Sequence, residues 1–184
     1  DRLVIEKLKE PIMHLVRNSI GHGIEPPQKR LMLGKPEEGH IRLSAELSGD
    51  YVYLQIIDDG AGFNRQGIAS KAVQLGLMSA DEEINDEKLL TLVSMPGFST
   101  AGKTDMISGR GVGMDVVATI LTEIGGRLEL ETQEGMGSCF TLQVPSSLAT
   151  TQGLILQIGN QRFGIALEMV ERIVRSHLEK ISIV

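Results

Sequence analysis

The spacing of apolar residues changes along this chain of 184 residues, and this change limits the possible folds more than any other sequence feature. From Val4 to Ile20 apolar residues recur at helical spacing, which indicates a helix face packed on a core. An interior proline removes a backbone hydrogen bond, so we predict a short first helix and a second helix that begins at Pro11. Residues 23–39, with three prolines, are expected to form a long loop around one or two helical turns.

Alternating and helical spacing divide the rest of the chain into further elements. Alternation predicts strands at 40–47, 51–57, 127–132, 138–144, 153–158 and 162–167. Helical spacing predicts helices at 65–75, 86–94 and 115–124. Pro145-Ser146-Ser147 marks an expected boundary between a first domain over residues 1–146 and a truncated domain over 147–184, which is too short for a core of its own.

Composition excludes several classes of protein. Lys and Arg number 18 against 24 Asp and Glu, a net charge of −6, and aromatic residues make up 3% of the chain. This argues against a nucleic-acid module, which needs a surplus of cations and aromatic platforms. The single Cys139 excludes an intramolecular disulfide and suits a reducing compartment. No apolar run reaches the ~18 residues of a membrane span, so we expect a cytoplasmic fragment of a longer soluble protein, without membrane insertion.

The first candidate site is formed by His14, Asn18 and His22, whose spacing of four residues places them on one helix face. An amide oxygen is a hard ligand suited to Mg²⁺, and an imidazole can accept a proton near pH 7. A phosphate or magnesium site is one interpretation. The others are a transition-metal site through the two histidines, which lacks a nearby thiolate or carboxylate, and an ordinary polar helix surface.

The second candidate site is Asp58-Asp59-Gly60-Ala61-Gly62, directly after an apolar strand. Glycines at alternate positions let the backbone turn sharply and leave room for a flat ligand. A carboxylate at the end of a strand can accept a hydrogen bond from an exocyclic amine. The alternative is a strand-to-helix turn with a capping aspartate.

The third candidate site combines the segment 95–100, Met-Pro-Gly-Phe-Ser-Thr, with 109–114, Gly-Arg-Gly-Val-Gly-Met, which opens a helix. Backbone N–H groups at a glycine-rich helix N-terminus can hold phosphate. The order of residues matches neither a Walker A loop nor a Rossmann fingerprint. The alternative is a flexible loop between two helices.

These sites, in this order, resemble the nucleotide-binding domain shared by histidine kinases, gyrase-type topoisomerases, Hsp90 and MutL proteins. Residues 14–25, 96–100 and 108–117 are similar to the CheA-type chemotaxis histidine kinases in particular. The resemblance implies an α+β fold, a two-layer α/β sandwich of the GHKL (Bergerat) ATPase type. Such a fold has a mixed, mainly antiparallel sheet, helices on one face and an ATP lid between. Residues from Ser146 onward resemble the start of a CheW-like regulatory β-barrel.

The resemblance also implies roles for individual residues. Asn18 would bind Mg²⁺ on the phosphates of ATP, His14 would act as the general base or an orienting group, and Asp58 would bind adenine. Thr141 would support that carboxylate, and 97–108 would form the lid. The residues implied in ATP binding are Arg17, Asn18, His22, Asp58, Gly60, Gly62, Phe98, Ser99, Thr100, Gly109, Gly111, Val112, Gly113, Met114 and Thr141.

The implied activity is transfer of the γ-phosphoryl group of Mg-ATP to a histidine on a separate phosphotransfer domain in two-component signalling. Implied partners are a CheW-like adaptor and chemoreceptors through the second domain, response regulators indirectly, and a second copy in a homodimer. A degenerate nucleotide-binding or scaffold module is the alternative; a gyrase-like ATPase is disfavoured because His14 replaces its glutamate. The chain departs from the family pattern in two places. Gly21 replaces the usual Asp, and residues just after the DxGxG motif include Gly67 but lack the usual Lys, whose charge we expect Arg65 to supply.

Overall fold

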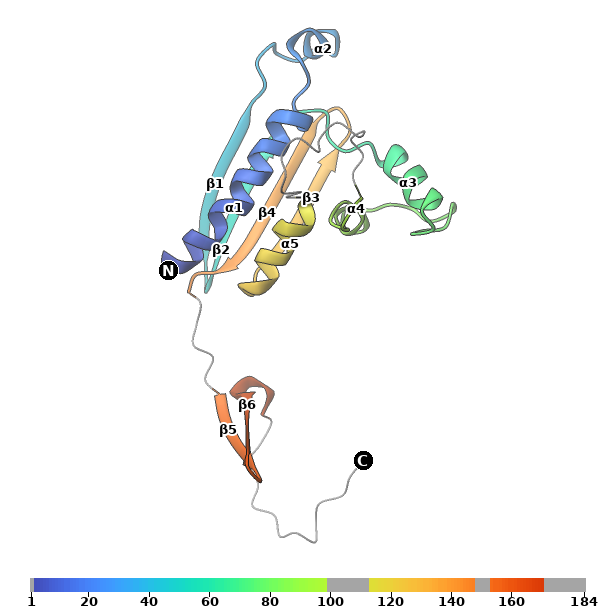
Figure 1. Ribbon diagram of the computed structural model, residues 1–184. Helices are drawn as coiled ribbons and strands as arrows, with labels where there is room; N and C mark the ends of the chain where they lie inside the picture. Colours follow the sequence, from blue (N-terminus) through green and yellow to red (C-terminus); the bar gives the residue numbers. More distant parts are fainter. Residues whose placement is uncertain (1, 99–112, 148–152, 171–184) are drawn as a thin grey trace. The chain divides into compact units, whose positions relative to one another are not determined.

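The computed structural model of the protein describes residues 2–98, 113–147 and 153–170 (Figure 1). The chain separates into two compact units, Asp1–Leu148 and Ala149–Val184. Within the described residues, none of the helices has both the length and the apolar character that a membrane crossing requires. The elements of the first unit are α1 (Arg2–Asn18), η1 (Ser19–Gly23), α2 (Pro27–Met32), β1 (Ile41–Ser48), β2 (Tyr51–Asp58), α3 (Arg65–Gln74), α4 (Asp86–Val93), α5 (Met114–Glu123), β3 (Arg127–Gln133) and β4 (Gly137–Pro145).

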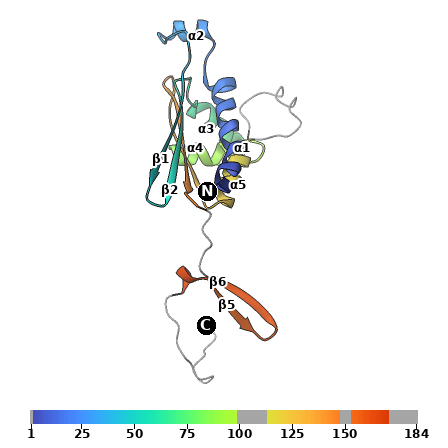
Figure 2. The same cartoon turned by 90° about the vertical axis from the view of Figure 1, so that its left-hand side faces the viewer.

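The first unit consists of an antiparallel sheet covered by helices on one face. The described strands are ordered β1-β2-β4-β3, and each neighbouring pair is antiparallel. Helices α1 and α5 lie side by side across the sheet, and the edge-on view shows the helices on the same side (Figures 1 and 2). The predicted α+β sandwich is therefore confirmed, although the pairings between described strands are wholly antiparallel and not mixed.

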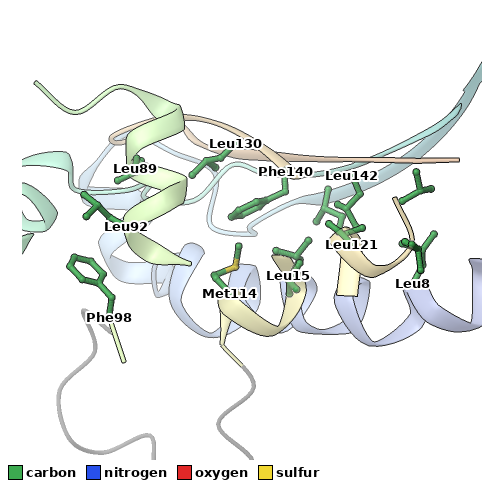
Figure 3. Close-up of a cluster of buried hydrophobic side chains, with 14 of the residues drawn as sticks. Leu8, Leu15, Leu89, Leu92, Phe98, Met114, Leu121, Leu130, Phe140 and Leu142 are labelled. Carbon is green, nitrogen blue, oxygen red and sulfur yellow. The ribbon is translucent and has the colours of Figure 1, made fainter. Parts of the chain in front are cut away.

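The core lies between this sheet and α1, α4 and α5 (Figure 3). Along β4 the buried residues alternate, with Phe140, Leu142 and Val144 each at most 3% exposed. They face Leu15 of α1 and Leu121 of α5 in an almost entirely aliphatic cluster. The alternation sets which face of the sheet each polar side chain of the strands occupies.

Helix α1 runs without a break from Arg2 to Asn18, so the predicted division at Pro11 is wrong. The ring of Pro11 is fully buried. A proline in a helix interior forfeits one hydrogen bond. Burial of its apolar ring in the core offsets that loss, a tertiary effect that local spacing does not report.

The second unit contains a hairpin of β5 (Gly153–Ile158) and β6 (Gln161–Ala166), followed by the short helix η3 (Leu167–Met169). The strands confirm the hairpin expected there. Several of its large apolar side chains are exposed, among them Ile155 at 76% and Ile158 at 66%. Its assignment to a CheW-like domain stays a prediction.

Candidate functional site

The first part of the site is formed where α1 changes into a π-helical turn. The turn η1 follows Asn18 directly, and the amide N of Ile24 donates to the carbonyl O of Ser19 over 2.7 Å. Such π-turns are frequent at functional sites. The turn buries Ser19, which is 3% exposed, and brings its hydroxyl to the end of β2.

Asp58, the last residue of β2, is 5% exposed and has both carboxylate oxygens held by the chain. Ser19 Oγ donates to Oδ2 over 2.9 Å, and the amide N of Gly60 donates to Oδ1 over 3.0 Å. A buried carboxylate with donors on both oxygens has a fixed orientation, which a base-binding group requires. Asp58, predicted as the adenine-binding residue, thus has a suitable setting.

The glycines beside Asp58 allow backbone segments to approach one another closely. A Cβ on Gly60 would lie 2.1 Å from the carbonyl O of Gly23, and one on Gly62 would lie 2.3 Å from that of Gln133. A Cβ on Gly23 would contact the Asp58 carboxylate at 3.4 Å. The close approach of the chain's own backbone therefore explains Gly60 and Gly62, and the space beside them that we expected a flat ligand to use is filled by backbone.

Strand register places Ser138, and not Thr141, on the face of the sheet that carries Asp58. Asp58 pairs with Ser138, and Thr141 pairs with Gln55. Directly paired residues share a face, and residues an odd number apart along a strand lie on opposite faces. Thr141 therefore faces away from the site, which corrects the expectation that it supports Asp58. Ser138 Oγ lies 3.1 Å from the Oγ1 of Thr132, so this face holds a polar pair.

The second part of the site lies one residue earlier, at the end of α1. Asn18 Nδ2 is 2.9 Å from His14 Nε2 and 3.7 Å from the Sδ of Met114, the first residue of α5. Burial lowers the pKa of His14, helped by the charge of Arg17 and opposed by Asp115. A neutral His14 has one unprotonated ring nitrogen, so the Nε2 that accepts from Asn18 is also the atom that could take up a proton.

Asn18 fits a magnesium site that is shared with a ligand. Its Nδ2 is committed to His14 and Met114, which leaves the amide oxygen as the hard ligand. Among the described residues, no group of three or more His, Cys, Asp and Glu side chains could hold a metal. Magnesium commonly binds few protein groups and completes its shell with water and substrate phosphates, so this sparse donor set suits it.

The remaining predicted residues are distributed over several settings. Arg17 and His22 are exposed on the α1–η1 segment, and Gly113 is the N-cap of α5. Phe98 is 7% exposed in the core (Figure 3). Lys71 Nζ lies 5.2 Å from its ring centroid. Five other predicted residues lie outside the described residues: Ser99, Thr100, Gly109, Gly111 and Val112. Most of the predicted lid, residues 97–108, also lies outside them.

Arg65, which we expected to supply the charge of the absent Lys, is engaged by other parts of the chain. Its Nη1 donates to the carbonyl O of Ile84 over 3.0 Å, and its Nη2 contacts the carboxylate of Asp86 and the carbonyl O of Thr132. These contacts join the start of α3 to α4 and β3. Arg65 therefore acts as a structural clamp.

A cluster of charged side chains beside Asp58 and Gly60 was not predicted from the sequence. Arg30 and Lys35, from the 23–39 segment, contact Glu25 and the Asp59-Gly60 backbone. Burial alone would raise the pKa of Glu25, but the hydrogen bond and charge of Lys35 and the charge of Arg30 outweigh burial and lower it. The sequence signal that could have indicated this cluster is the presence of both acidic and basic residues within the segment 23–39, which we expected to be a loop.

Comparisons with known proteins show what this chain is similar to. Residues 5–148 match the family described as histidine kinase-, DNA gyrase B-, and HSP90-like ATPase. The chain is 41% identical over 170 residues to the chemotaxis protein CheA of Rhizobium meliloti, covering 92% of this chain and 22% of the relative. It is 42% identical over 172 residues to CheA of Bacillus subtilis, covering 92% and 26%.

The chain thus spans about a quarter of the length of these curated relatives. Among solved structures, the catalytic domain of histidine kinase ThkA matches with a TM-score of 0.49 and 19% identity, covering 78% of this chain and 68% of that one.

Proposed function

The chain belongs to the histidine kinase-, DNA gyrase B-, and HSP90-like ATPase family, and on that premise we propose that it is the catalytic domain of a chemotaxis histidine kinase. The similarity to CheA proteins over 92% of the chain supports this assignment. The proposed reaction transfers the γ-phosphoryl group of ATP to a histidine of a separate phosphotransfer domain.

One observation carries the proposal: two consecutive residues, the last of α1 and the first of η1, belong to the two parts of the site. Asn18 contacts His14, and Ser19 holds Asp58. A nucleotide has a base at one end and phosphates at the other, so it needs two such parts close together. The exocyclic amine of adenine would donate to Asp58, whose carboxylate is held in one orientation by the chain.

At the phosphate end, Asn18 would hold Mg²⁺ through its amide oxygen, together with the phosphates of ATP. The metal supplies neutralisation of phosphate charge when bound. His14, whose pKa burial lowers, is available as a base. In the proposed reaction the bond from the γ-phosphorus to the bridging oxygen breaks, a bond to the acceptor imidazole nitrogen forms, ADP leaves, and His14 takes the proton from the acceptor ring.

The partners of the parent protein are also part of the proposal. They comprise the phosphotransfer domain, a CheW-like adaptor and chemoreceptors reached through residues 147–184, response regulators indirectly, and a second copy in a homodimer. The expected location is the cytoplasm. These proposals follow from the similarity to proteins named CheA, and the domain boundary at residue 146 is proposed on the same basis.

A transfer assay tests the function. The chain is mixed with a separately prepared phosphotransfer domain, Mg²⁺ and ATP labelled at the γ-phosphate, and label on that domain is measured. We expect transfer, and a large loss in His14→Ala with ATP affinity retained. Absence of transfer despite ATP binding would favour a nucleotide-binding module without kinase activity. Unaltered transfer in His14→Ala would remove the base from the mechanism but leave the assignment of the domain intact.

A further inference from the structure

Arg30 of α2 is a buried arginine whose N–H groups are all engaged. It is 1% exposed. Its Nε donates to the carbonyl O of Pro36 over 2.8 Å, its Nη1 to Glu25 and the Asp59 carbonyl O, and its Nη2 to the Glu38 carbonyl O and the Asp59 carboxylate. A guanidinium has five N–H donors, so these five bonds use its full capacity.

All N–H donors of the Lys35 ammonium are also engaged in hydrogen bonds. Its Nζ donates to Glu25 Oε1 over 2.8 Å, to the carbonyl O of Asp59 over 2.9 Å and to the carbonyl O of Gly60 over 2.7 Å. An ammonium has three donors, and all three are used. Two saturated cations therefore meet at the Asp59 carbonyl, which Arg30 Nη1 reaches over 3.1 Å.

This carbonyl belongs to the peptide group that holds the base-binding carboxylate. The peptide unit joining Asp59 to Gly60 carries the Asp59 carbonyl O on one side and the Gly60 N–H on the other. That N–H donates to Asp58 Oδ1 over 3.0 Å. Because a trans peptide group is planar, fixing the direction of its carbonyl also fixes the direction of its N–H. Cations on the oxygen also polarise the group, which strengthens N–H donation.

We propose that Arg30 and Lys35 are positioning residues for base recognition, because they hold the Asp59 carbonyl and thereby aim the Gly60 N–H at Asp58. Neither side chain needs to touch the nucleotide. The proposal rests on the function proposed above, in which Asp58 accepts a hydrogen bond from the exocyclic amine of adenine. It adds that the charged 23–39 segment determines how well that carboxylate discriminates between bases.

The experiment compares three ligands by calorimetry on the full chain: ATP, inosine triphosphate and inorganic tripolyphosphate. Inosine carries a carbonyl in place of the exocyclic amine, so it reports on Asp58, and tripolyphosphate reports on the phosphate end alone. In Lys35→Met we expect the preference for ATP over inosine triphosphate to fall about tenfold, the loss expected for a weakened hydrogen bond to a charged group. Affinity for tripolyphosphate should change by less than about twofold, which corresponds to a change in binding free energy of less than about 0.4 kcal/mol.

Three further variants and one spectroscopic measurement keep the test specific. Lys35→Arg should restore part of the preference. The matched control is Lys88→Met, because Lys88 of α4 also pairs with a glutamate, Glu82, over 2.9 Å but lies outside the 23–39 segment. This variant should leave all three affinities unchanged. The amide proton resonance of Gly60 should move upfield in Lys35→Met, as its hydrogen bond to Asp58 weakens. Arg30→Lys should likewise lower the preference for ATP over inosine triphosphate and move the Gly60 amide proton resonance upfield.

The outcomes separate the two proposals. If the wild-type chain binds ATP no better than inosine triphosphate, base recognition by Asp58 is wrong, and the positioning proposal is overturned with it. If wild type prefers ATP but Lys35→Met and Arg30→Lys retain the preference and the Gly60 resonance, the positioning proposal alone is overturned. An equal loss of affinity for all three ligands would also overturn it, because that result shows only a general structural role.

Discussion

The base end and the phosphate end of the site differ in how far the folded chain completes them. At the base end, Asp58 is buried, both of its oxygens have donors from the chain, and a saturated charged cluster lies behind it. At the phosphate end, His14 and Asn18 are only half-buried and hydrogen bond chiefly to each other. The proposed base end is therefore organised before a ligand arrives, whereas the proposed phosphate end would gain metal and phosphate partners from the ligand.

Asp58→Asn should produce the largest effect, because it places an amide where a charged acceptor is needed. We expect ATP affinity to fall about 100-fold, in line with about 1.5–3 kcal/mol for a hydrogen bond to a charged group. Calorimetry measures the affinity, and Asp81→Asn in an exposed turn is the control. An affinity within a few fold of wild type would show that the base pocket lies elsewhere.

Asn18→Ala tests the phosphate end and its dependence on metal. With Mg²⁺ present we expect about a tenfold loss of ATP affinity, a typical cost of disturbing a metal site. After chelation of metal with EDTA, wild type and variant should bind ATP equally weakly. Lys9→Ala, on an exposed position of α1, serves as the control. A loss that persists unchanged in EDTA would assign Asn18 a role other than metal binding.

Ser138→Ala and Thr141→Ala test which face of the sheet supports the base end. Ser138 shares a face with Asp58 and Thr141 does not, so we expect about a fivefold loss of ATP affinity in Ser138→Ala, equivalent to about 1 kcal/mol. Thr141→Ala should bind as wild type does. The reverse order of effects would contradict the face assignment that follows from the strand register.

The protonation of His14 gives a pH-dependent contrast. Its folded-state pKa is below the ordinary value of 6.5, so the unfolded chain takes up this proton at higher pH than the folded chain. The contribution to the free energy of unfolding is therefore present above pH 6.5 and is lost as pH falls through the lowered pKa. Denaturant unfolding at pH 7.5 and 5.5 should show a smaller decrease in His14→Gln than in wild type. An equal decrease in both proteins would mean that burial does not disfavour the charged imidazole.

Gly21→Asp should have the smallest effect. The position is exposed, and a Cβ there would meet nothing within 4 Å, so the side chain fits. If Asn18 and the ligand phosphates suffice for the metal, affinity for Mg-ATP should change by less than about twofold, or about 0.4 kcal/mol. A sharp rise in affinity would instead show that the natural site lacks a metal ligand and that the phosphate end is incomplete even with ATP bound.

Local patterns in the sequence were sufficient for most elements. The expected helix at 65–75 is observed as Arg65–Gln74, and the expected strand at 51–57 as Tyr51–Asp58. In these segments the residues that repeat at regular spacing in the sequence lie on the face that packs on the core. The predicted break at Pro11 was wrong because burial of the proline ring, a tertiary effect, outweighs the local tendency of proline to interrupt a helix.

The candidate site was predictable only in part, because some of its features depend on pairing across the fold. Asp58 and Asn18 belong to motifs that stand out in the sequence. The structure connects the two motifs because Ser19, which donates to Asp58, directly follows Asn18. The choice between Ser138 and Thr141 depends on strand register, where an odd shift reverses the face. The role of Arg30 depends on partners up to 29 positions away, which no local spacing reveals.

The junction of α1 and η1 has a mechanical consequence. A residue step in a helix turns the side chain by about 100° around the axis, so Asn18 and Ser19 project in different directions from one rod. If α1 rolled to bring Asn18 deeper into the site, it would carry the Ser19 hydroxyl away from Asp58. Only a narrow range of roll angles keeps Ser19 within reach of Asp58 and Asn18 within reach of Met114 on α5, so a force that twists α1 would disturb the proposed base end and the proposed phosphate end at once.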